Sequence, residues 1–216
     1  MIYLDNVSKW YSTKKGEQHI FSSITFEIPT DHNIALLGSN GAGKSTLFRM
    51  LAGSEYPNKG QIKTDATISW PVALSTGIHP KMTGRENTRF IARVNGVQDL
   101  EEYEGRVQNF AELGRKYDLP VQSYSSGMRS RLAFSCCMGI DFDLYLIDEA
   151  LSVGDKKFKR KAKRALLDKS RTANILMVSH EIDEIRLFCD SAIVIDNGEL
   201  TFYNDLEEAI MVYEGE

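Results

Sequence analysis

Long apolar segments are missing from this sequence. No stretch approaches the ~18 uninterrupted apolar residues of a membrane-spanning helix. The start of the chain, Met1–Asp5, has no basic region followed by an apolar one, as a secretion signal would. We therefore expect neither a membrane span nor a secretion signal.

Cysteine and positive charge are also scarce. Cys136, Cys137 and Cys189 are an odd number of cysteines without metal-site spacing, in segments of buried character. We expect reduced structural thiols, as in a cytoplasmic protein. Lysine and arginine total 26 against 30 acidic residues, a formal charge of −4, so the overall charge does not indicate a nucleic-acid partner.

Size and composition predict one globular domain, or one domain with a subdomain. The chain has 216 residues and is 42% hydrophobic, which is enough for a sizeable core. No repeat, low-complexity tract or linker separates a second domain.

The strongest motif is Gly38–Ser45, which matches the phosphate-binding pattern G-x-x-x-x-G-K-[ST] at every fixed position. It lies between the apolar run Ile34–Leu37, suited to a buried strand, and Thr46–Leu51, which has helical spacing. Its glycines let backbone N–H groups turn towards one anion, Lys44 can reach the β- and γ-phosphates, and Ser45 can bind Mg²⁺. We predict a nucleotide site formed by Gly38, Ser39, Asn40, Gly41, Ala42, Gly43, Lys44, Ser45 and Thr46.

The segment before this loop is predicted to be β structure interrupted by one polar loop. Strand-like runs stand at Ile2–Leu4 and Phe21–Ile28, and Lys9–Gly16 between them is polar with two aromatic residues. Tyr11 in that loop is either an anchor in the core or a ring that stacks on an adenine base.

From about residue 74 to residue 139 the pattern becomes helical and polar, which predicts an inserted helical subdomain. Near its end, Ser125, Ser126 and Gly127 precede the helical segment Met128–Met138. This turn either caps the helix or offers a second phosphate site at a helix N-terminus.

Two further strands end in polar residues. The apolar run 143–147 leads to Asp148 and Glu149, and the run 175–178 leads to His180 after one serine. The carboxyl ends of parallel strands form the ligand-binding edge of open α/β sheets. We expect Asp148 to hold Mg²⁺ through water, Glu149 to orient or deprotonate the attacking water, and His180 to meet a γ-phosphate oxygen.

The one strongly basic block is Lys156–Arg164. Its helical spacing, with an inner apolar stripe that begins at Phe158, fits a solvated helix face. The alternatives are a surface for phosphate backbones or for an anionic membrane. The chain then closes with a hairpin through Asn197-Gly198 and a helix over Asp205–Tyr213.

With its motifs in this order, the chain resembles the ATP-binding subunit of ABC transporters over essentially its full length. The resemblance identifies Gly38–Ser45 as the Walker A loop and Tyr124–Met128 as the signature sequence. It implies a single nucleotide-binding domain over residues 1–216 with an α/β fold: a P-loop NTPase core with a RecA-like mixed sheet, helices on both faces and an antiparallel β subdomain. The α-helical subdomain, residues 74–139, is inserted within it.

The same resemblance assigns roles to single residues. It makes Asp148 and Glu149 the end of Walker B, Asp155 the D-loop aspartate and His180 the switch histidine, and it favours Tyr11 as the ring that stacks on adenine. The implied cofactors are ATP and Mg²⁺. In the resulting mechanism Glu149 is the general base, and His180 senses the γ-phosphate.

ABC subunits dimerise head to tail, so the resemblance implies a homodimer. Ser125, Ser126 and Gly127 of one copy would contact the γ-phosphate that Lys44 of the other copy holds. Two departures from the family pattern concern this machinery. The signature reads Tyr-Ser-Ser-Gly-Met, with Met128 in place of glutamine, and the Q-loop glutamine expected near Leu74 is missing.

Phrases such as Ser69-Trp70-Pro71, Thr83–Asn87 and Asp148–Asp155 resemble the branch of the family that exports cell-surface polysaccharides. Because the chain ends shortly after the hairpin, it is more similar to the capsular exporters of Gram-negative bacteria than to O-antigen exporters with an added carbohydrate-binding domain. The resemblance implies a peripheral protein on the cytoplasmic face of the inner membrane. Its partners would be integral membrane permease subunits and further envelope export proteins.

Other functions remain as alternatives. Export of O-antigen or teichoic acid would use the same motifs. A soluble ABC-type ATPase acting on nucleic acid has only the basic block in its favour, and no nucleic acid is expected as a partner. A small-molecule kinase would leave the signature turn and His180 without a role, and Asp148, Glu149 and His180 argue against a regulator that does not hydrolyse nucleotide.

Overall fold

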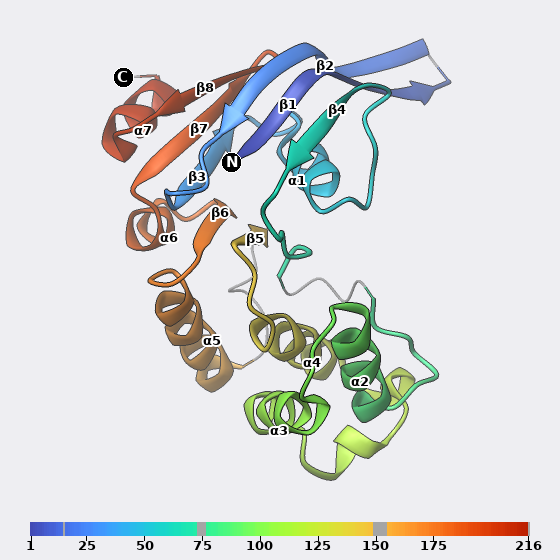
Figure 1. Ribbon diagram of the computed structural model, residues 1–216. Coiled ribbons are helices and arrows are strands. Elements are labelled where there is room, and N and C mark those ends of the chain that lie inside the picture. The colour runs from blue at the N-terminus through green and yellow to red at the C-terminus, as the bar shows by residue number, and fades with distance from the viewer. Residues whose placement is uncertain (15, 73–76, 149–154, 216) are drawn as a thin grey trace. The chain divides into compact units, whose positions relative to one another are not determined.

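The computed structural model describes residues 1–14, 16–72, 77–148 and 155–215, and the chain divides into two compact units. The first unit comprises Met1–Pro71, Phe142–Glu149 and Ser170–Glu216 and contains the β-sheets labelled in Figure 1. The second comprises Val72–Asp141 and Ala150–Lys169 and is helical. The predicted helical subdomain, residues 74–139, lies within this second unit, which also takes in residues 150–169.

One sheet of the first unit has three antiparallel strands in the order β2-β1-β4. Strand β1 (Ile2–Thr13) lies between β2 (Gly16–Ile28) and β4 (Lys59–Thr64). The fully buried side chains of β1 are Ile2, Leu4 and Val7. Burial of such side chains stabilises the fold by ~1.5–3 kcal/mol each, so this face of the sheet is fixed on the core.

The polar loop predicted over Lys9–Gly16 is wrong. Strand β1 continues to Thr13, β2 begins at Gly16, and Trp10 and Tyr11 pair with His19 and Gln18 across the hairpin. Tryptophan, tyrosine and threonine favour strands. The sequence pattern hid this strand because its side chains are half-buried or exposed from Trp10 onwards, so no apolar alternation marks it.

The second sheet has five strands in the order β5-β6-β3-β7-β8. The first four run parallel, and β8 is antiparallel to β7. This is the predicted mixed sheet, and the hairpin closes through Asn197 and Gly198, both with the positive φ that a tight hairpin turn requires. The strand bounds are Leu144–Asp148 for β5, Asn174–Val178 for β6, Ile34–Gly38 for β3, Ser191–Asp196 for β7 and Glu199–Tyr203 for β8.

Three helices of the first unit pack on this sheet: α1 (Lys44–Leu51) contacts β3, α6 (Ile182–Phe188) contacts β6, and α7 (Leu206–Glu214) contacts β3 and β7. Strand β3 is buried at all of its positions, and Leu47 and Phe48 of α1 belong to the same hydrophobic core. The parallel strands β5, β6 and β3 all end at one edge of the sheet, so the loops after them start close together.

The second unit is built from capped helices. Helix α2 (Gly84–Val94) starts with a capping box between Thr83 and Glu86, and Asp99 and Ser125 cap α3 (Leu100–Ala111) and α4 (Ser126–Met138). Capping side chains satisfy the N–H groups that a helix leaves unpaired at its start. The remaining elements are two short 3-10 helices, η1 (Gly114–Asp118) and η2 (Val121–Ser123), and helix α5 (Lys156–Lys169).

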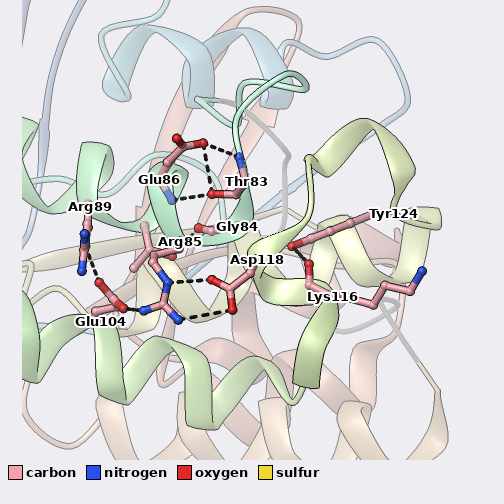
Figure 2. Close-up of polar contacts among 10 residues, drawn as sticks. Thr83, Gly84, Arg85, Glu86, Arg89, Glu104, Lys116, Asp118 and Tyr124 are labelled. Atoms are coloured by element: carbon pink, nitrogen blue, oxygen red, sulfur yellow. Dashed lines mark hydrogen bonds and ion pairs between the residues drawn. The ribbon is translucent and has the colours of Figure 1, made fainter.

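Figure 2 shows the charged side chains that connect α2, α3 and η1. Glu104 of α3 is buried and pairs with both Arg85 and Arg89 of α2. The Arg89 Nε to Glu104 Oε2 distance is 2.5 Å. Arg85 also donates to Asp118 of η1, at 2.7 Å from Nε. Because a buried carboxylate needs such partners, this cluster fixes the mutual position of the three elements.

Helix α5 contains the basic block Lys156–Arg164 and is amphipathic, as predicted. Phe158, Ala162 and Leu166 are buried, and the ring of Phe158 packs against Phe110 and Phe134. Several of its cations are engaged within the second unit. Lys157 and Lys161 pair with Glu112, and Lys169 pairs with Asp141.

The three cysteines, all within the described residues, are buried and none is joined in a disulfide, as expected for structural thiols. Burial raises the pKa of Cys136 to about 12, so this thiol stays protonated at neutral pH. Within the described ranges, no helix combines the length and the apolar character needed to cross a membrane.

Candidate nucleotide site

A pocket of about 450 Å³ opens beside the phosphate loop in the first unit. Most of its lining residues come from the predicted site, and three were not predicted: Gln18, Ile20 and Val178. The residues that the sequence predicted and the structure brings together here are Tyr11, Asn40, Gly41, Gly43, Lys44, Ser45, Thr46, Asp148 and His180.

The backbone of the loop explains its glycines. Gly43 precedes α1 with φ +111°, and a Cβ there would lie 2.7 Å from atoms of Ile20 and Phe21. Gly38 ends β3, and a Cβ there would lie 2.7 Å from the carbonyl oxygen of Ile195. Side chains are therefore excluded at both ends of the loop. Helix α1 has no side-chain cap at its N-terminus, which leaves its first N–H groups to an anionic ligand.

Lys44 lies folded over this loop. Its Nζ donates to the carbonyl oxygens of Gly38, at 2.5 Å, and Ser39, at 3.1 Å. Ala42 N donates to Ser39 O at 3.1 Å and closes the turn between them. The ammonium group is thus held at the mouth of the loop, where a phosphate oxygen can replace a carbonyl as its partner.

The polar side chains at the sheet edge reach the same pocket. Asp148 ends β5 next to Val178 at the end of β6, and His180 follows two residues later, exposed to solvent. Ser179 holds the turn before α6, because its Oγ accepts from Glu181 N at 3.1 Å. Glu149, the predicted general base, lies outside the described residues.

Ser45 and Asp148 offer the donor atoms for a divalent cation. Both line the pocket, one with a hydroxyl oxygen and the other with a carboxylate. Oxygen ligands of this kind, completed by water and phosphate oxygens, are those that Mg²⁺ prefers. The residues present therefore fit the predicted cofactor.

The position of Tyr11 bears on the two interpretations that its sequence left open. Its side chain is half-buried and lines the pocket with the phosphate loop, so it lies at a pocket wall and not deep in the core. The unpredicted Gln18 lies beside it because the two residues pair across the β1–β2 hairpin. Recognition of that hairpin in the sequence would have found Gln18 too.

A second pocket, of about 670 Å³, lies in the second unit at the N-terminus of α4. It contains the signature residues Ser125, Ser126 and Gly127. Ser125 caps the helix, with its Oγ accepting from Met128 N at 3.3 Å. The predicted structural role of this turn is therefore confirmed, and its flank towards the pocket remains open to a ligand.

Asp155 lines this second pocket. Its carboxylate accepts from Phe158 N at 2.9 Å and pairs with Arg131 at 2.5 Å. The hydrogen bond from the Phe158 backbone, together with the charge of Arg131, lowers the pKa of Asp155 below its usual value. Glu112 and Lys116, which no motif in the sequence indicated, line the same pocket. The expected Q-loop position near Leu74 lies outside the described residues.

Comparison with known proteins gives the family. The family model described as ABC transporter matches residues 21–152. The chain is 43% identical to the polysialic acid transport ATP-binding protein KpsT of Escherichia coli, over 99% of this chain and 96% of that protein. It is 40% identical to the capsule polysaccharide export ATP-binding protein CtrD of Neisseria meningitidis serogroup B, over 99% and 98%. ATP-binding proteins of O-antigen and teichoic acid export are more distant relatives.

Among solved structures, the fold is similar to a dimeric, post-hydrolysis state of the ATP-binding cassette MJ0796 bound to ADP and Pi. The TM-score is 0.76 with 20% identity, over 95% of this chain and 99% of that chain. This likeness concerns the fold of the cassette. The family match and the full-length similarity to the export proteins show that the chain belongs to the ABC transporter family.

Proposed function

We propose that this chain is the ATP-binding and hydrolysing subunit of an ABC exporter that drives capsular polysaccharide through a separate membrane permease. The observation that carries the proposal is the pocket that unites Lys44, Ser45, Asp148 and His180 with the phosphate loop. A phosphate-binding loop, an acidic strand end and a histidine at one pocket are the parts that phosphoryl transfer to water requires.

In the proposed reaction the phosphate loop and Lys44 bind the β- and γ-phosphates and stabilise the charge that develops during transfer. Bound Mg²⁺, held by Ser45 and by Asp148 through water, would neutralise phosphate charge. Glu149 deprotonates the attacking water, and His180 donates a hydrogen bond to a γ-phosphate oxygen.

The second pocket supports a dimer in which two copies share each nucleotide. Ser125, Ser126 and Gly127 stand at a helix N-terminus, where an anion is stabilised by N–H groups and by the helix dipole. In a head-to-tail homodimer this surface would meet the γ-phosphate bound by the partner copy. Asp155, beside the same turn, would lie at that interface.

The export role rests on the relatives. KpsT and CtrD carry names of polysialic acid transport and of capsule polysaccharide export, and both align with this chain over nearly their full lengths. By this similarity the chain would act at the cytoplasmic face of the inner membrane, as a peripheral subunit bound to integral permease subunits and working with further envelope export proteins. The more distant O-antigen and teichoic acid proteins make those cargoes the second choice.

The role in nucleic-acid binding receives little support from the basic block. Lys157 and Lys161 of α5 pair with Glu112, so part of its charge is neutralised within the unit. Binding to phosphate backbones by the remaining cations would weaken steeply with added salt. Salt-sensitive binding of DNA or RNA by the purified protein would favour this alternative over export.

The test of hydrolysis is Glu149→Gln. General-base catalysis contributes ~10²–10⁴-fold to such reactions, so we expect the ATPase rate to fall by roughly that factor while ATP still binds. Glu207→Gln is the matched control, because the half-exposed Glu207 of α7 pairs with Arg186 of α6. A near-normal ATPase rate in Glu149→Gln would overturn the assignment of the general base.

The test of export is made in cells. A tagged copy of the chain should copurify with a multi-spanning permease from detergent-solubilised membranes. Expression of Glu149→Gln in place of the natural chain should remove capsular polysaccharide from the cell surface. If capsular polysaccharide on the cell surface is unchanged and O-antigen or teichoic acid is lost instead, that polymer is the cargo of the exporter.

A further inference from the structure

We propose that Glu55 is a positioning residue for the base of the nucleotide, because it holds the Tyr11 side chain as one wall of the nucleotide pocket. The proposal rests on the proposed function, since it takes the bound nucleotide to be ATP with its adenine on Tyr11. Glu55 belongs to no motif of the sequence and follows the C-terminal end of α1.

The Glu55 carboxylate gathers three donors. Its Oε2 accepts from the Tyr11 hydroxyl and from Arg49 Nε, both at 2.9 Å. Its Oε1 pairs with Lys9 Nζ at 2.8 Å. Arg49 completes the cluster by donating from Nη2 to the Tyr11 oxygen at 3.0 Å. Charge-assisted hydrogen bonds of this kind are the strongest that side chains make, so the position of the Tyr11 hydroxyl is well determined.

Two side chains of this cluster lie largely out of solvent, whereas Arg49 is 47% exposed. The Glu55 side chain is 20% exposed and the Lys9 side chain 8%. Burial by itself would raise the pKa of Glu55, but the hydrogen bonds from Lys9, Arg49 and Tyr11 outweigh it and lower the pKa to about 2. The carboxylate is therefore ionised at neutral pH, when it can accept from all three donors at once.

The cluster also selects which side of the Tyr11 ring meets a base. Lys9 Nζ lies over the ring, 5.2 Å from its centroid, and so covers one face by a cation–π contact. A base stacks on the opposite face. Thr46, whose hydroxyl lies 3.3 Å from the Tyr11 oxygen, lines the same pocket as the first residues of α1. The wall for the base is thereby tied to the helix that binds the phosphates.

The alternative role for Glu55 is purely structural: to tie the β1–β2 hairpin to α1. The two roles differ in what a substitution changes. Loss of a structural tie would weaken the binding of every ligand of the pocket, or only the stability of the fold. Loss of a positioning residue weakens the binding of the base and leaves the binding of the phosphates as it was.

The experiment compares two ligands on the full-length protein: ATP, and inorganic tripolyphosphate, which lacks the base and ribose. Dissociation constants with Mg²⁺ are measured for the natural chain, Glu55→Ala, Glu55→Gln, Tyr11→Phe, Tyr11→Ala and the double variant Tyr11→Ala with Glu55→Ala. Glu207→Gln is the matched control, because it removes the carboxylate of an arginine pair whose residues do not line the pocket.

We expect Tyr11→Ala to weaken ATP binding by roughly 5- to 150-fold, the range for loss of one base–aromatic stack. Glu55→Ala should weaken it by a part of that, about 3- to 10-fold, with tripolyphosphate binding unchanged. Glu55→Gln and Tyr11→Phe keep the ring and nearly all atoms of the cluster. Their affinities for ATP should lie between those of the natural chain and of Glu55→Ala. In the Tyr11→Ala background the second substitution should change ATP binding no further.

Equal losses for ATP and tripolyphosphate, additive losses in the double variant, or unchanged ATP binding in Glu55→Ala would each overturn the positioning role. If Glu55→Ala does not fold, the comparison of the two ligands in Glu55→Gln and Tyr11→Phe decides in its place. Failure of the ATP binding on which this proposal rests is distinct, because the natural chain itself would then bind no ATP.

Discussion

Replacement of Glu104 by alanine removes the carboxylate that Arg85 and Arg89 share in the second unit (Figure 2). The Glu104 side chain is 9% exposed, whereas Arg89 is 46% exposed. Removal of one partner of a buried ion pair costs ~3–5 kcal/mol, because it leaves the other charge without compensation. Arg85 keeps Asp118 as a partner, at 2.7 Å, and water can reach Arg89. We therefore expect a loss at the lower end of the range, about 3 kcal/mol.

Two measurements give the size and the place of this effect. Urea unfolding followed by circular dichroism gives the loss of stability. Both tryptophans, Trp10 and Trp70, belong to the first unit, so their fluorescence follows that unit separately. Amide hydrogen exchange should show faster opening of α2, α3 and η1 in Glu104→Ala than in the natural chain.

Glu102→Ala is the control on the same helix. Its side chain is 64% exposed and lies 3.9 Å from Arg106 one turn away, and such a surface pair contributes ~0–1 kcal/mol. If Glu104→Ala costs no more than Glu102→Ala, or if its added exchange is confined to the first unit, the reasoning from burial and shared charge is refuted.

Two more predictions concern the first unit. Gly43→Ala should abolish measurable ATP binding, because its Cβ would meet Phe21 at 2.7 Å and the backbone φ of +111° is strained for alanine; Gly105→Ala, in open space on α3, should bind ATP normally, and binding by both variants would contradict the prediction. The stabilising contribution of Glu55, whose pKa falls from 4.5 to about 2 on folding, should be complete above the unfolded value and be lost as the pH drops towards the folded one. Urea midpoints measured over this range should fall less steeply in Glu55→Gln, and equal slopes would contradict the assigned pKa shift.

The parts of the site that could be predicted from the sequence are those whose chemistry is local. A phosphate-binding loop needs glycines, a lysine and a hydroxyl side chain in one short loop between a strand and a helix. All of these residues are contiguous at Gly38–Ser45. Asp148 was predicted because it directly follows an apolar run, and His180 because it follows another after one serine; parallel strands bring such positions to one edge.

The parts that could not be predicted depend on pairing between distant segments. Lys9, Arg49 and Glu55 have no common spacing, and only the packing of β1 beside α1 brings them together. Gln18 reaches the pocket through the register of the β1–β2 hairpin, whose residues from Trp10 to Gly16 carry no apolar alternation that marks a strand. In a two-stranded ribbon both faces of a strand are exposed to solvent and can carry polar residues. The alternation of apolar and polar residues that identifies a half-buried strand is then absent.

The β1–β2 hairpin determines on which face of the strand the Tyr11 side chain lies, which a loop would not do. Within the described residues β1 pairs with β4 as far as Ser8 and with β2 as far as Thr13, so Tyr11 stands on a two-stranded ribbon. Along a strand, successive side chains alternate between opposite faces, and a shift of one residue exchanges the faces. From Trp10 to Thr13, past the register shifts between Leu4 and Trp10, β1 pairs with β2 in regular register, and the wall that we propose for adenine depends on it. A single residue inserted between Trp10 and Tyr11 would present a different side chain to the pocket, although every residue type of the site would still be present.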